Sequence, residues 1–342
     1  MADFYQNGIV SSLHNFNHNN DKVLETELET ISQDQPMELI LPCLYSELEG
    51  EALKDIIEKI NKVNFLNHVI IGLDRANEKE FLFAKKYFSK LNVQHSILWN
   101  DGPKLRKLQK ILNQEGIADV EDGKGKNVWY CIGYAISRNT AEAIAFHDCD
   151  IKTYHENILI RLFYPLVSRS MGYSFSKGYY PRYAENKLNG RVTRLLVTPL
   201  VKSLIMLFGK NEYLEFIDSF KYPLAGEYAF KKHLLREIRI PSDWGLEIGI
   251  LSELQRNYSS KLCCQVDLAD QYDHKHQFLS EDDDTKGLSR MVTSVSSLFS
   301  VSPTPNCKIF SLVSNKSRNS EFSSAAKTIW NWPSQVFLAI KE

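Results

Sequence analysis

Two aspartates one residue apart, Asp148 and Asp150, are the side chains of this sequence best suited to binding a divalent cation. They follow the apolar run 141–146, which predicts a buried strand that delivers both acids to its carboxyl end. Carboxylate oxygens are the preferred ligands of Mg²⁺ and Mn²⁺, and such a cation can be held against the phosphates of a nucleotide. The alternative is a solvated turn that caps the next helix, since aspartate is a favoured N-cap.

A lysine between two glycines, Lys124, precedes the acid-bearing strand and begins a predicted helix. Its charge and the exposed N–H groups of a helix N-terminus suit a phosphate. The segment is not a P-loop, because six residues separate Gly116 from Gly123 and no Ser or Thr follows the lysine. An ordinary flexible turn is the alternative.

The ends of the first two predicted strands carry candidates for binding the nucleoside. Pro42 and Leu44 lie at the end of the first strand, and Asp74 lies at the end of the second. Backbone groups there could hold a uracil-like base, and the acid could hold a ribose hydroxyl. Helix capping by Ser46 or Asp74 is the alternative, and for Ser46 it is the favoured interpretation.

Residues Gly190, Arg191, Val192 and Thr193 open a predicted helix. An arginine, a hydroxyl and free N–H groups at one helix N-terminus make a local anion site, suited to the phosphate or carboxylate of a small acceptor. A helix start with a solvent-facing arginine explains the same residues equally well.

Further candidates lie late in the chain. His274 and His276 follow a predicted strand at 262–268 and could bind metal, although single histidines more often cap or pack. Glu227 and Glu247 are acids in apolar, glycine-containing surroundings. Such acids either accept hydrogen bonds from the backbone or take part in chemistry, and the sequence leaves both possibilities open.

The elements that position these residues alternate between apolar and amphipathic runs, which is typical of a parallel sheet with crossover helices. Strands are predicted at 37–44, 65–73, 93–98 and 141–146. Helices are predicted at 46–63, 77–91, 103–114 and 127–138, and later at 192–208, 213–219 and 227–235. The expected fold is therefore an α/β domain whose ligands bind at the carboxyl ends of the strands.

Four regions are expected along the chain. They are an N-terminal extension at 1–36, a nucleotide-sugar-binding half at 37–150, a more helical acceptor-binding half of the same domain at 151–280, and a C-terminal extension at 281–342. The leucine-rich segment 195–208 is predicted to be a buried helix, because it is too short and too charged to span a bilayer.

Composition excludes several classes of partner. The 342 residues include 41 basic and 42 acidic side chains, so no overall charge favours nucleic acid or an anionic membrane. The six cysteines lack the spacing of a zinc site or a disulfide framework and are expected to be reduced. The N-terminal residues lack the pattern of a secretory signal, so a cytoplasmic location is expected.

Several motifs occur in one order: L-P-C-L at 41–44, G-K-G at 123–125, D-x-D at 148–150, G-R-V-T at 190–193, P-L-A-G-E at 223–227, G-L-E-I-G at 245–249 and a late histidine. Over about residues 37–280 the chain thereby resembles the retaining glucosyl-3-phosphoglycerate synthases and their mannosyl relatives. The resemblance implies a GT-A fold, a homodimer and Mg²⁺ or Mn²⁺ as cofactor. It implies transfer of glucose from a nucleoside-diphosphate sugar, most often UDP-glucose, to the 2-hydroxyl of 3-phosphoglycerate.

The resemblance also implies roles for the donor side. Pro42 and Leu44 would line the base site and Lys124 would approach the nucleotide. Asp148 and Asp150 would meet ribose, diphosphate and metal. His274 would complete the metal shell, with His276 as its rival, since here the histidine lies in a Y-D-H-K-H sequence where the family has Arg-x-His-x-Asn.

For the acceptor side, the resemblance implies that Gly190, Arg191, Val192 and Thr193 hold the phosphate and carboxylate of the acceptor. Leu224 would lie beside the transferred sugar, and Glu247 would bind hydroxyls of the sugar or of the acceptor. The first strand of the family commonly ends with an acid, and this chain has Ser46 at that position. Glu47 is expected to take the place of that acid.

In the expected mechanism the acceptor hydroxyl attacks the sugar on the same face from which the leaving group departs. The metal offsets the negative charge that develops on UDP. Retention would ordinarily require a nucleophilic carboxylate on the opposite face, and the sequence designates none. A mannosyl transferase using GDP-mannose, a sugar-phosphate nucleotidyltransferase and a non-catalytic sugar-nucleotide sensor are the alternatives. A nucleotidyltransferase would carry a Gly-rich basic loop after the first strand, and 41–49 has none.

Overall fold

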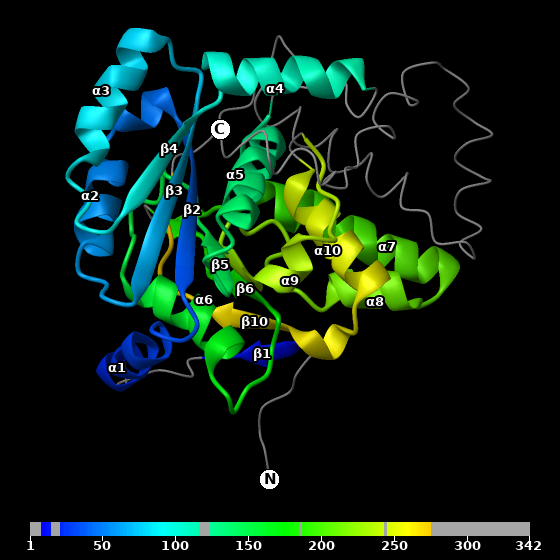
Figure 1. Cartoon of the computed structure of the whole chain (residues 1–342). Helices are drawn as coiled ribbons and strands as arrows, with labels where there is room; N and C mark the ends of the chain where they lie inside the picture. The colour runs from blue at the N-terminus through cyan, green and yellow to red at the C-terminus, as the bar shows by residue number, and fades with distance from the viewer. Residues whose placement is uncertain (1–7, 15–20, 116–122, 185–186, 243–244, 275–342) are drawn as a thin grey trace.

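The computed structural model describes residues 8–14, 21–115, 123–184, 187–242 and 245–274. A single eight-stranded sheet runs through this part of the chain, in the order β1-β10-β6-β9-β5-β2-β3-β4 (Figure 1). Its strands are β1 (Ser11–Leu13), β2 (Met37–Leu44), β3 (Leu66–Asp74), β4 (His95–Trp99), β5 (Ala143–Phe146), β6 (Phe175–Tyr179), β9 (Tyr228–Lys231) and β10 (Cys263–Asp267). A separate two-stranded sheet pairs β7 (Tyr183–Ala184) with β8 (Lys187–Leu188).

Neighbouring strands of the large sheet pair in parallel except at β9, which is antiparallel to both β5 and β6. The predicted α/β fold with a mixed, mainly parallel sheet is therefore confirmed. Parallel strands end at one edge of a sheet, so the residues after β2, β3, β5, β6 and β10 share the carboxyl edge.

Helices complete the layers on both faces of the sheet (Figure 1). They are α1 (Asp21–Ile31), α2 (Glu51–Ile60), α3 (Glu78–Phe88), α4 (Pro103–Gln114), α5 (Lys124–Arg138), α6 (Asn157–Val167), α7 (Thr198–Phe208), α8 (Glu212–Asp218), α9 (Lys232–Leu235) and α10 (Leu246–Asn257). Short helical turns occur at η1 (Tyr45–Glu49), η2 (Thr193–Val197) and η3 (Ser260–Leu262).

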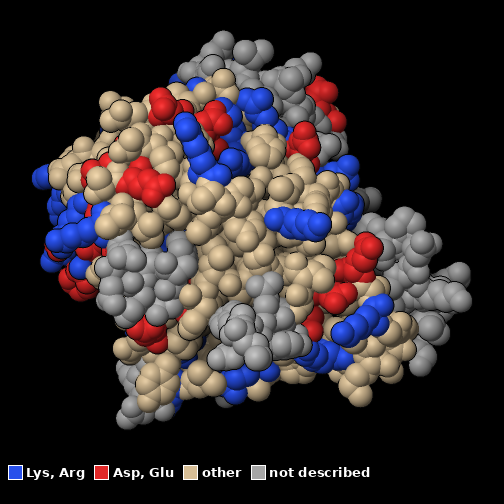
Figure 2. All heavy atoms as spheres, turned by 90° about the horizontal axis from the view of Figure 1, so that it is seen from below, with Lys and Arg blue, Asp and Glu red and all other residues tan. Residues whose placement is uncertain are grey.

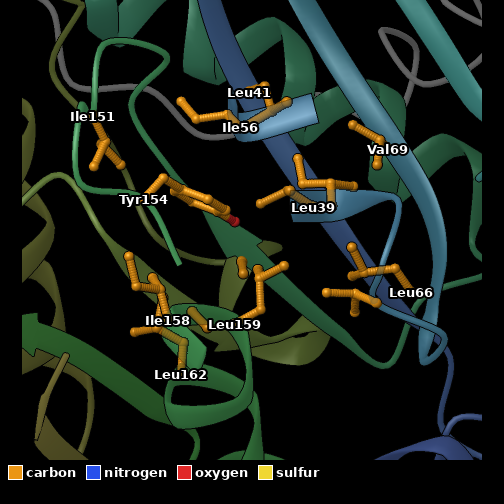
Figure 3. Packing of buried hydrophobic residues seen from close by; sticks show 14 of the residues in the cluster. Leu39, Leu41, Ile56, Leu66, Val69, Ile151, Tyr154, Ile158, Leu159 and Leu162 are labelled. Atoms are coloured by element: carbon orange, nitrogen blue, oxygen red, sulfur yellow. The ribbon is translucent and has the colours of Figure 1, made fainter. Parts of the chain in front are cut away.

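Two apolar cores lie on opposite faces of the sheet. Successive side chains of a strand point to opposite faces, so Leu39 and Leu41 of β2 pack with α2 and α6, whereas Ile40 joins the core that contains α5 and α10. Figure 3 shows the first of these cores, where Ile56 of α2 and Leu159 of α6 meet β2. Both faces of the central strands are buried, which is why they read as continuous apolar runs.

Three helix predictions were inaccurate. The helix predicted at 46–63 is interrupted at Gly50, whose extended backbone separates η1 from α2. The helix predicted at 227–235 is strand β9 in its first half, because Tyr228–Lys231 pair with β5 and β6 in the centre of the sheet, and only its second half is helical, as α9. Ser46 lies inside η1, whose N-cap is Leu44, so the favoured capping role of Ser46 was wrong.

The helix predicted at 195–208 was found, but its burial was predicted wrongly. Leu195, Met206 and Leu207 are 62%, 86% and 74% exposed. An apolar helix was taken for a core helix because composition alone does not tell which side of a helix meets the sheet. Among the residues that the structure describes, every helix is too short or too polar to traverse a lipid bilayer.

The face of the molecule drawn in Figure 2 carries basic and acidic side chains interspersed among uncharged residues. This distribution agrees with the nearly equal numbers of the two kinds in the sequence.

Candidate active site

The nucleoside candidates lie side by side at the carboxyl edge. Leu44 of β2 pairs in register with Asp74 of β3, and Pro42 pairs with Gly72. Leu44 is 37% exposed, whereas Glu47 and Asp74 are half-buried. The helix α3 that follows is capped by Asn77, in a capping box with Glu80, rather than by Asp74. Asp74 is therefore not needed as the N-cap of that helix.

Lys124 joins two of the predicted acids. Its Nζ lies 2.6 Å from Oδ1 of Asp148 and 3.0 Å from Oε1 of Glu247, three residues brought together from α5, the end of β5 and α10. Burial works against the charged lysine, but the two carboxylates raise the pKa of Lys124 well above its ordinary value. Burial would raise the pKa of Asp148, yet Lys124 outweighs it and lowers that pKa. Lys124 and Asp148 are therefore both charged at neutral pH.

The backbone around Lys124 explains why the flanking glycine is needed. The N–H of Lys126 donates to the carbonyl oxygen of Ser242 at 3.0 Å, which seats the first turn of α5 against the segment before α10. A Cβ on Gly125 would collide with the carbonyl of Pro241. Close packing of these two segments thus brings Lys124 and Glu247 within reach of each other.

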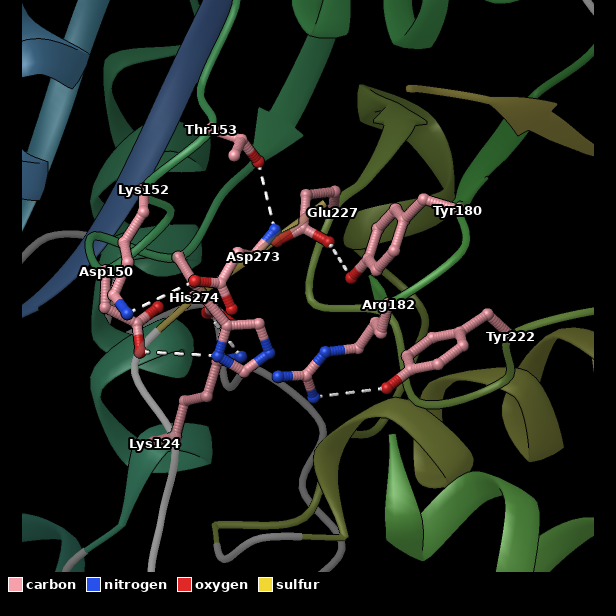
Figure 4. Close-up of polar contacts among 11 residues, drawn as sticks. Lys124, Asp150, Lys152, Thr153, Tyr180, Arg182, Tyr222, Glu227, Asp273 and His274 are labelled. Carbon is pink, nitrogen blue, oxygen red and sulfur yellow. Dashed lines mark hydrogen bonds and ion pairs between the residues drawn. The ribbon is translucent and has the colours of Figure 1, made fainter. Parts of the chain in front are cut away.

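His274 lies beside Asp150 (Figure 4). Its Nδ1 is 3.6 Å from Oδ2 of Asp150, and an antiparallel bridge between Ile151 and His274 fixes the two backbones. The Nζ of Lys152 lies 3.2 Å from Oδ2 of Asp273, which adds a second link. Burial lowers the pKa of His274, but the hydrogen bond and charge of Asp150 outweigh it, so that pKa is raised. His276 lies outside the described residues.

These side chains fit a magnesium or manganese ion only as part of its shell. Within the described ranges, no group of three or more His, Cys, Asp and Glu side chains is assembled that could hold a metal alone. Asp150 and His274 provide one carboxylate and one imidazole, while Asp148 is paired with Lys124. Mg²⁺ is commonly bound by one or two carboxylates together with substrate phosphates and water. The donor set therefore fits a metal that arrives with a diphosphate.

The predicted anion-binding segment follows β8. Gly190 has a φ of +75°, which favours glycine, and a Cβ at this position would make a tight 3.2 Å contact with the Tyr222 ring. Val192 and Thr193 are only 7% and 5% exposed, whereas Arg191 is exposed. The Thr193 hydroxyl is buried without a hydrogen-bond partner among the described residues. A buried hydroxyl without a protein partner can still bond to a ligand or to water.

Arg182 was missed by the sequence analysis. It follows β6 at the carboxyl edge, its Cδ lies 3.6 Å from where a Cβ on Gly190 would be, and its Nη1 donates to the Tyr222 hydroxyl at 3.4 Å. Figure 4 draws Arg182 between His274 and Tyr222, and its positive charge opposes protonation of His274. Arg182 lies in no recognisable motif, so the sequence offered no clear signal for it.

Glu227 and Leu224 lie in one turn next to Asp148. The Tyr180 hydroxyl donates to Oε2 of Glu227 at 2.6 Å, and burial together with the charge of Asp148 raises the pKa of Glu227. A Cβ on Gly226 would collide with the Asp148 carboxylate, so the turn packs directly on that acid. Leu224 is half-buried at the start of the turn.

A mixed, mainly parallel sheet with paired acids at its carboxyl edge is an arrangement of the GT-A type. Solved structures of glucosyl-3-phosphoglycerate synthase from Mycobacterium tuberculosis have the same fold. The one in complex with Mn²⁺, UDP-glucose and phosphoglyceric acid matches with a TM-score of 0.61 at 20% identity, over 84% of this chain and 85% of that chain. The one in complex with Mg²⁺ and UDP matches with a TM-score of 0.61, over 85% of each.

Two curated relatives are more similar in sequence to this chain than the solved structures are. Glucosyl-3-phosphoglycerate synthase of Persephonella marina is 44% identical over 86% of this chain and 73% of its own length. That of Methanococcoides burtonii is 37% identical over 87% of this chain and 72% of its own length. No protein-family model matches the chain. The chain belongs to the glucosyl-3-phosphoglycerate synthase family.

Proposed function

We propose that this chain transfers glucose, with retention, from UDP-glucose to the 2-hydroxyl of 3-phosphoglycerate. The chain's 44% identity to a glucosyl-3-phosphoglycerate synthase carries the choice of substrates. The site geometry agrees with that choice, because a cation-binding acid, a lysine and an arginine-bearing helix start lie at one edge of the sheet. Glucosyl-3-phosphoglycerate and UDP are the products.

On the donor side, Pro42, Leu44, Glu47 and Asp74 bind the nucleoside. Lys124 and Asp148 meet the ribose and diphosphate, and Asp150 and His274 hold Mg²⁺ or Mn²⁺. When bound, the metal stabilises negative charge on the leaving diphosphate. Lys124 adds a positive charge at the same place, and its contact with Glu247 keeps its ammonium oriented toward the site.

On the acceptor side, the N–H groups of Gly190 to Thr193, the hydroxyl of Thr193 and the guanidinium of Arg191 bind the phosphate and carboxylate. Arg182 provides a second guanidinium at this position, in place of the arginine that the late histidine segment lacks. Leu224 and Glu247 contact the transferred sugar.

Retention results because the acceptor hydroxyl attacks the sugar on the same face from which UDP departs. The proton of that hydroxyl passes to a phosphate oxygen of the leaving UDP. Support comes from Glu227, because burial and the charge of Asp148 raise its pKa and so disfavour the nucleophilic carboxylate form. Both candidate nucleophiles also accept hydrogen bonds within the protein. Glu247 accepts from Lys124 at 3.0 Å, and Glu227 accepts from Tyr180 at 2.6 Å. Isolation of a glucosyl ester on either glutamate would contradict this mechanism.

We expect release of UDP from UDP-glucose only when 3-phosphoglycerate and Mg²⁺ or Mn²⁺ are both present. The assay should include GDP-mannose as an alternative donor, UTP with glucose 1-phosphate, and the same mixtures with chelator. Pyrophosphate release from UTP would indicate a nucleotidyltransferase, and tight binding of UDP-glucose without turnover would indicate a sensor. Either outcome would overturn the proposal.

We expect Arg191→Ala to raise KM for 3-phosphoglycerate about 30-fold, since one charge-assisted contact to a phosphate is worth about 2 kcal/mol. KM for UDP-glucose should change less than about threefold, because donor and acceptor contacts are separate. Initial rates with each substrate varied in turn give both constants.

Arg194→Ala is the matched control for this variant. Arg194 is also exposed and lies one helical turn further on, where its guanidinium contacts the carbonyl of Leu188 at 3.2 Å. Its removal should leave both KM values unchanged. An equal rise in both KM values for Arg191→Ala would place Arg191 outside the acceptor site.

We also propose a cytoplasmic homodimer, with 37–150 binding the donor and 151–280 the acceptor. The five cysteines in the described part of the chain are free thiols, which is typical of a reducing compartment. Exposed Leu195, Met206 and Leu207 are apolar side chains that association could bury. Light scattering of the purified protein measures its oligomeric state. The predicted N-terminal extension at 1–36 is in part built into this unit, because β1 pairs with β10 and Leu28 of α1 is fully buried, and 281–342 is proposed as a C-terminal extension.

A further inference from the structure

A buried lysine lies beneath the site and has no role in the function described so far. Lys177, in the middle of β6, is only 1% exposed. Its Nζ donates to the carbonyl oxygen of Ala225 at 2.7 Å and lies 5.3 Å from the centroid of the Tyr228 ring. Burying an ammonium group is costly, and an apolar side chain of similar volume would often be at least as stabilising. The charge therefore calls for an explanation other than stability.

The partner of Lys177 belongs to the turn that links α8 to β9. This turn, 223–227, is bonded to β6 by two neighbouring residues. Lys177 bonds to Ala225 through its side chain, and the N–H of Gly178 donates to the carbonyl oxygen of Glu227 at 2.8 Å. The N–H of Ala225 in turn donates to the carbonyl of Tyr222 at 3.1 Å. The middle of the turn is thus held on the sheet mainly by the lysine.

The position of this turn is coupled to the donor side. Gly226 packs so closely on the Asp148 carboxylate that no Cβ could fit between them. Leu224, one residue before Ala225, is half-buried at the start of the same turn. A shift of the Ala225 carbonyl would therefore move both Leu224 and the surface against which Asp148 rests.

Charges from several elements surround the ammonium group. Burial lowers the pKa of Lys177 to about 8, while Glu247 and Glu227 counteract this effect. The positive charge of Lys124 lowers the pKa of Lys177 further, and the negative charge of Asp148 raises it. Two cations, Lys124 and Lys177, therefore face three acids in the interior of the site.

We propose that Lys177 is a positioning residue for glucosyl transfer, whose ammonium group holds the Ala225 carbonyl and so fixes the turn 223–227 against Asp148. It acts through the turn and does not itself touch substrate. The inference rests on the proposed function, because it assigns Lys177 to the same reaction. It predicts a defect in the transfer step rather than in binding of either substrate.

The test replaces Lys177 with methionine, which has a similar length and no charge. We expect kcat to fall about 100-fold, as a displacement of about 1 Å in a reacting group can cause. KM for UDP-glucose and for 3-phosphoglycerate should each stay within about threefold of the wild type. The melting temperature should stay within a few degrees, since loss of a hydrogen bond is offset by removal of a buried charge.

Lys177→Gln keeps an N–H donor without the charge and should recover part of the lost kcat. It also carries the test if the methionine variant fails to fold. Ser176→Ala is the matched control, because Ser176 lies on the same strand, is fully buried and pairs in register with Ala229 rather than with the turn. Its kcat should equal that of the wild type.

The outcomes separate the two proposals. A wild-type protein that releases no UDP under any donor and acceptor pair would overturn the proposed function. An active wild type with unchanged kcat in Lys177→Met, or with a defect confined to KM, would overturn the role of Lys177 alone. The role of Lys177 would also be overturned if kcat fell equally in Lys177→Met and in the control Ser176→Ala.

Discussion

Asp150→Ala is expected to lower kcat for glucosyl transfer at least about a thousandfold, the largest effect of any single substitution in this chain. We assign two side chains to the metal, Asp150 and His274, and Asp150 is the carboxylate of this pair. Asp150 also orients His274, whose Nδ1 lies 3.6 Å from its Oδ2. Loss of the Asp150 carboxylate removes one proposed metal ligand and the partner that orients the second, His274. The effect should be large because stabilisation of charge on the leaving group is commonly the largest part of catalysis. UDP release measured over a range of Mn²⁺ concentrations tests this.

Asp270→Ala provides the control, because Asp270 is an exposed acid close to His274 in sequence. Its activity and metal requirement should match the wild type. Full activity of Asp150→Ala at the wild-type metal concentration would disprove the metal assignment. Activity restored by high Mn²⁺ would support it, since His274 and the diphosphate would still bind the ion weakly.

Lys124→Met is expected to reduce both activity and stability. Lys124 is 20% exposed and forms ion pairs with both Asp148 and Glu247, so its removal leaves two acids close together without their shared cation. Breaking such a group costs about 3 kcal/mol. Turnover should fall by at least about a hundredfold, because we assign the same ammonium group to the diphosphate.

The stability defect of Lys124→Met should depend on pH. Lys124 lowers the pKa of Asp148 below its ordinary value, so the stabilisation exists above that ordinary value and is lost as pH falls through the lowered pKa. The difference in free energy of unfolding between variant and wild type should therefore be largest near neutral pH and shrink in acid. Urea denaturation at pH 7 and in increasingly acidic buffers measures it.

Lys79→Met is the corresponding control, since Lys79 is exposed on α3. Replacement of an exposed lysine usually changes stability by less than about 0.5 kcal/mol. Equal losses in the two variants would show that the loss of a lysine, rather than of the contacts with Asp148 and Glu247, is responsible. A pH-independent difference for Lys124→Met would contradict the assigned ion pairs.

Elements with strong local signals were predicted well from the sequence. Strand β2 and helix α4 have the predicted bounds, because β2 is apolar apart from Glu38 and α4 has Pro103 at its first position. Asp148, Asp150 and Lys124 were predicted at one site because each lies at the end or start of such an element. Their spatial arrangement then follows from the parallel sheet.

Features that depend on distant contacts were not predictable in the same way. Strand β9 has a sequence that also suits a helix, and only pairing with β5 and β6 makes it a strand. The contact of Lys124 with Glu247 joins residues 123 positions apart, through packing of two helix starts. Arg182 has no neighbouring motif, so its position beside Tyr222 became apparent only from the fold.

The reversed direction of β9 has a consequence for how this site could change its specificity. Because β9 lies between β5 and β6, the segments that follow those two strands are about 10 Å apart, two strand spacings, at the same edge. One segment carries Asp148 and Asp150, and the other carries Arg182 and leads to Gly190. In the proposed assignment the two substrates are thus bound by separate loops of one sheet. New acceptors could be accommodated by remodelling the second loop, while the nucleotide site stays as it is.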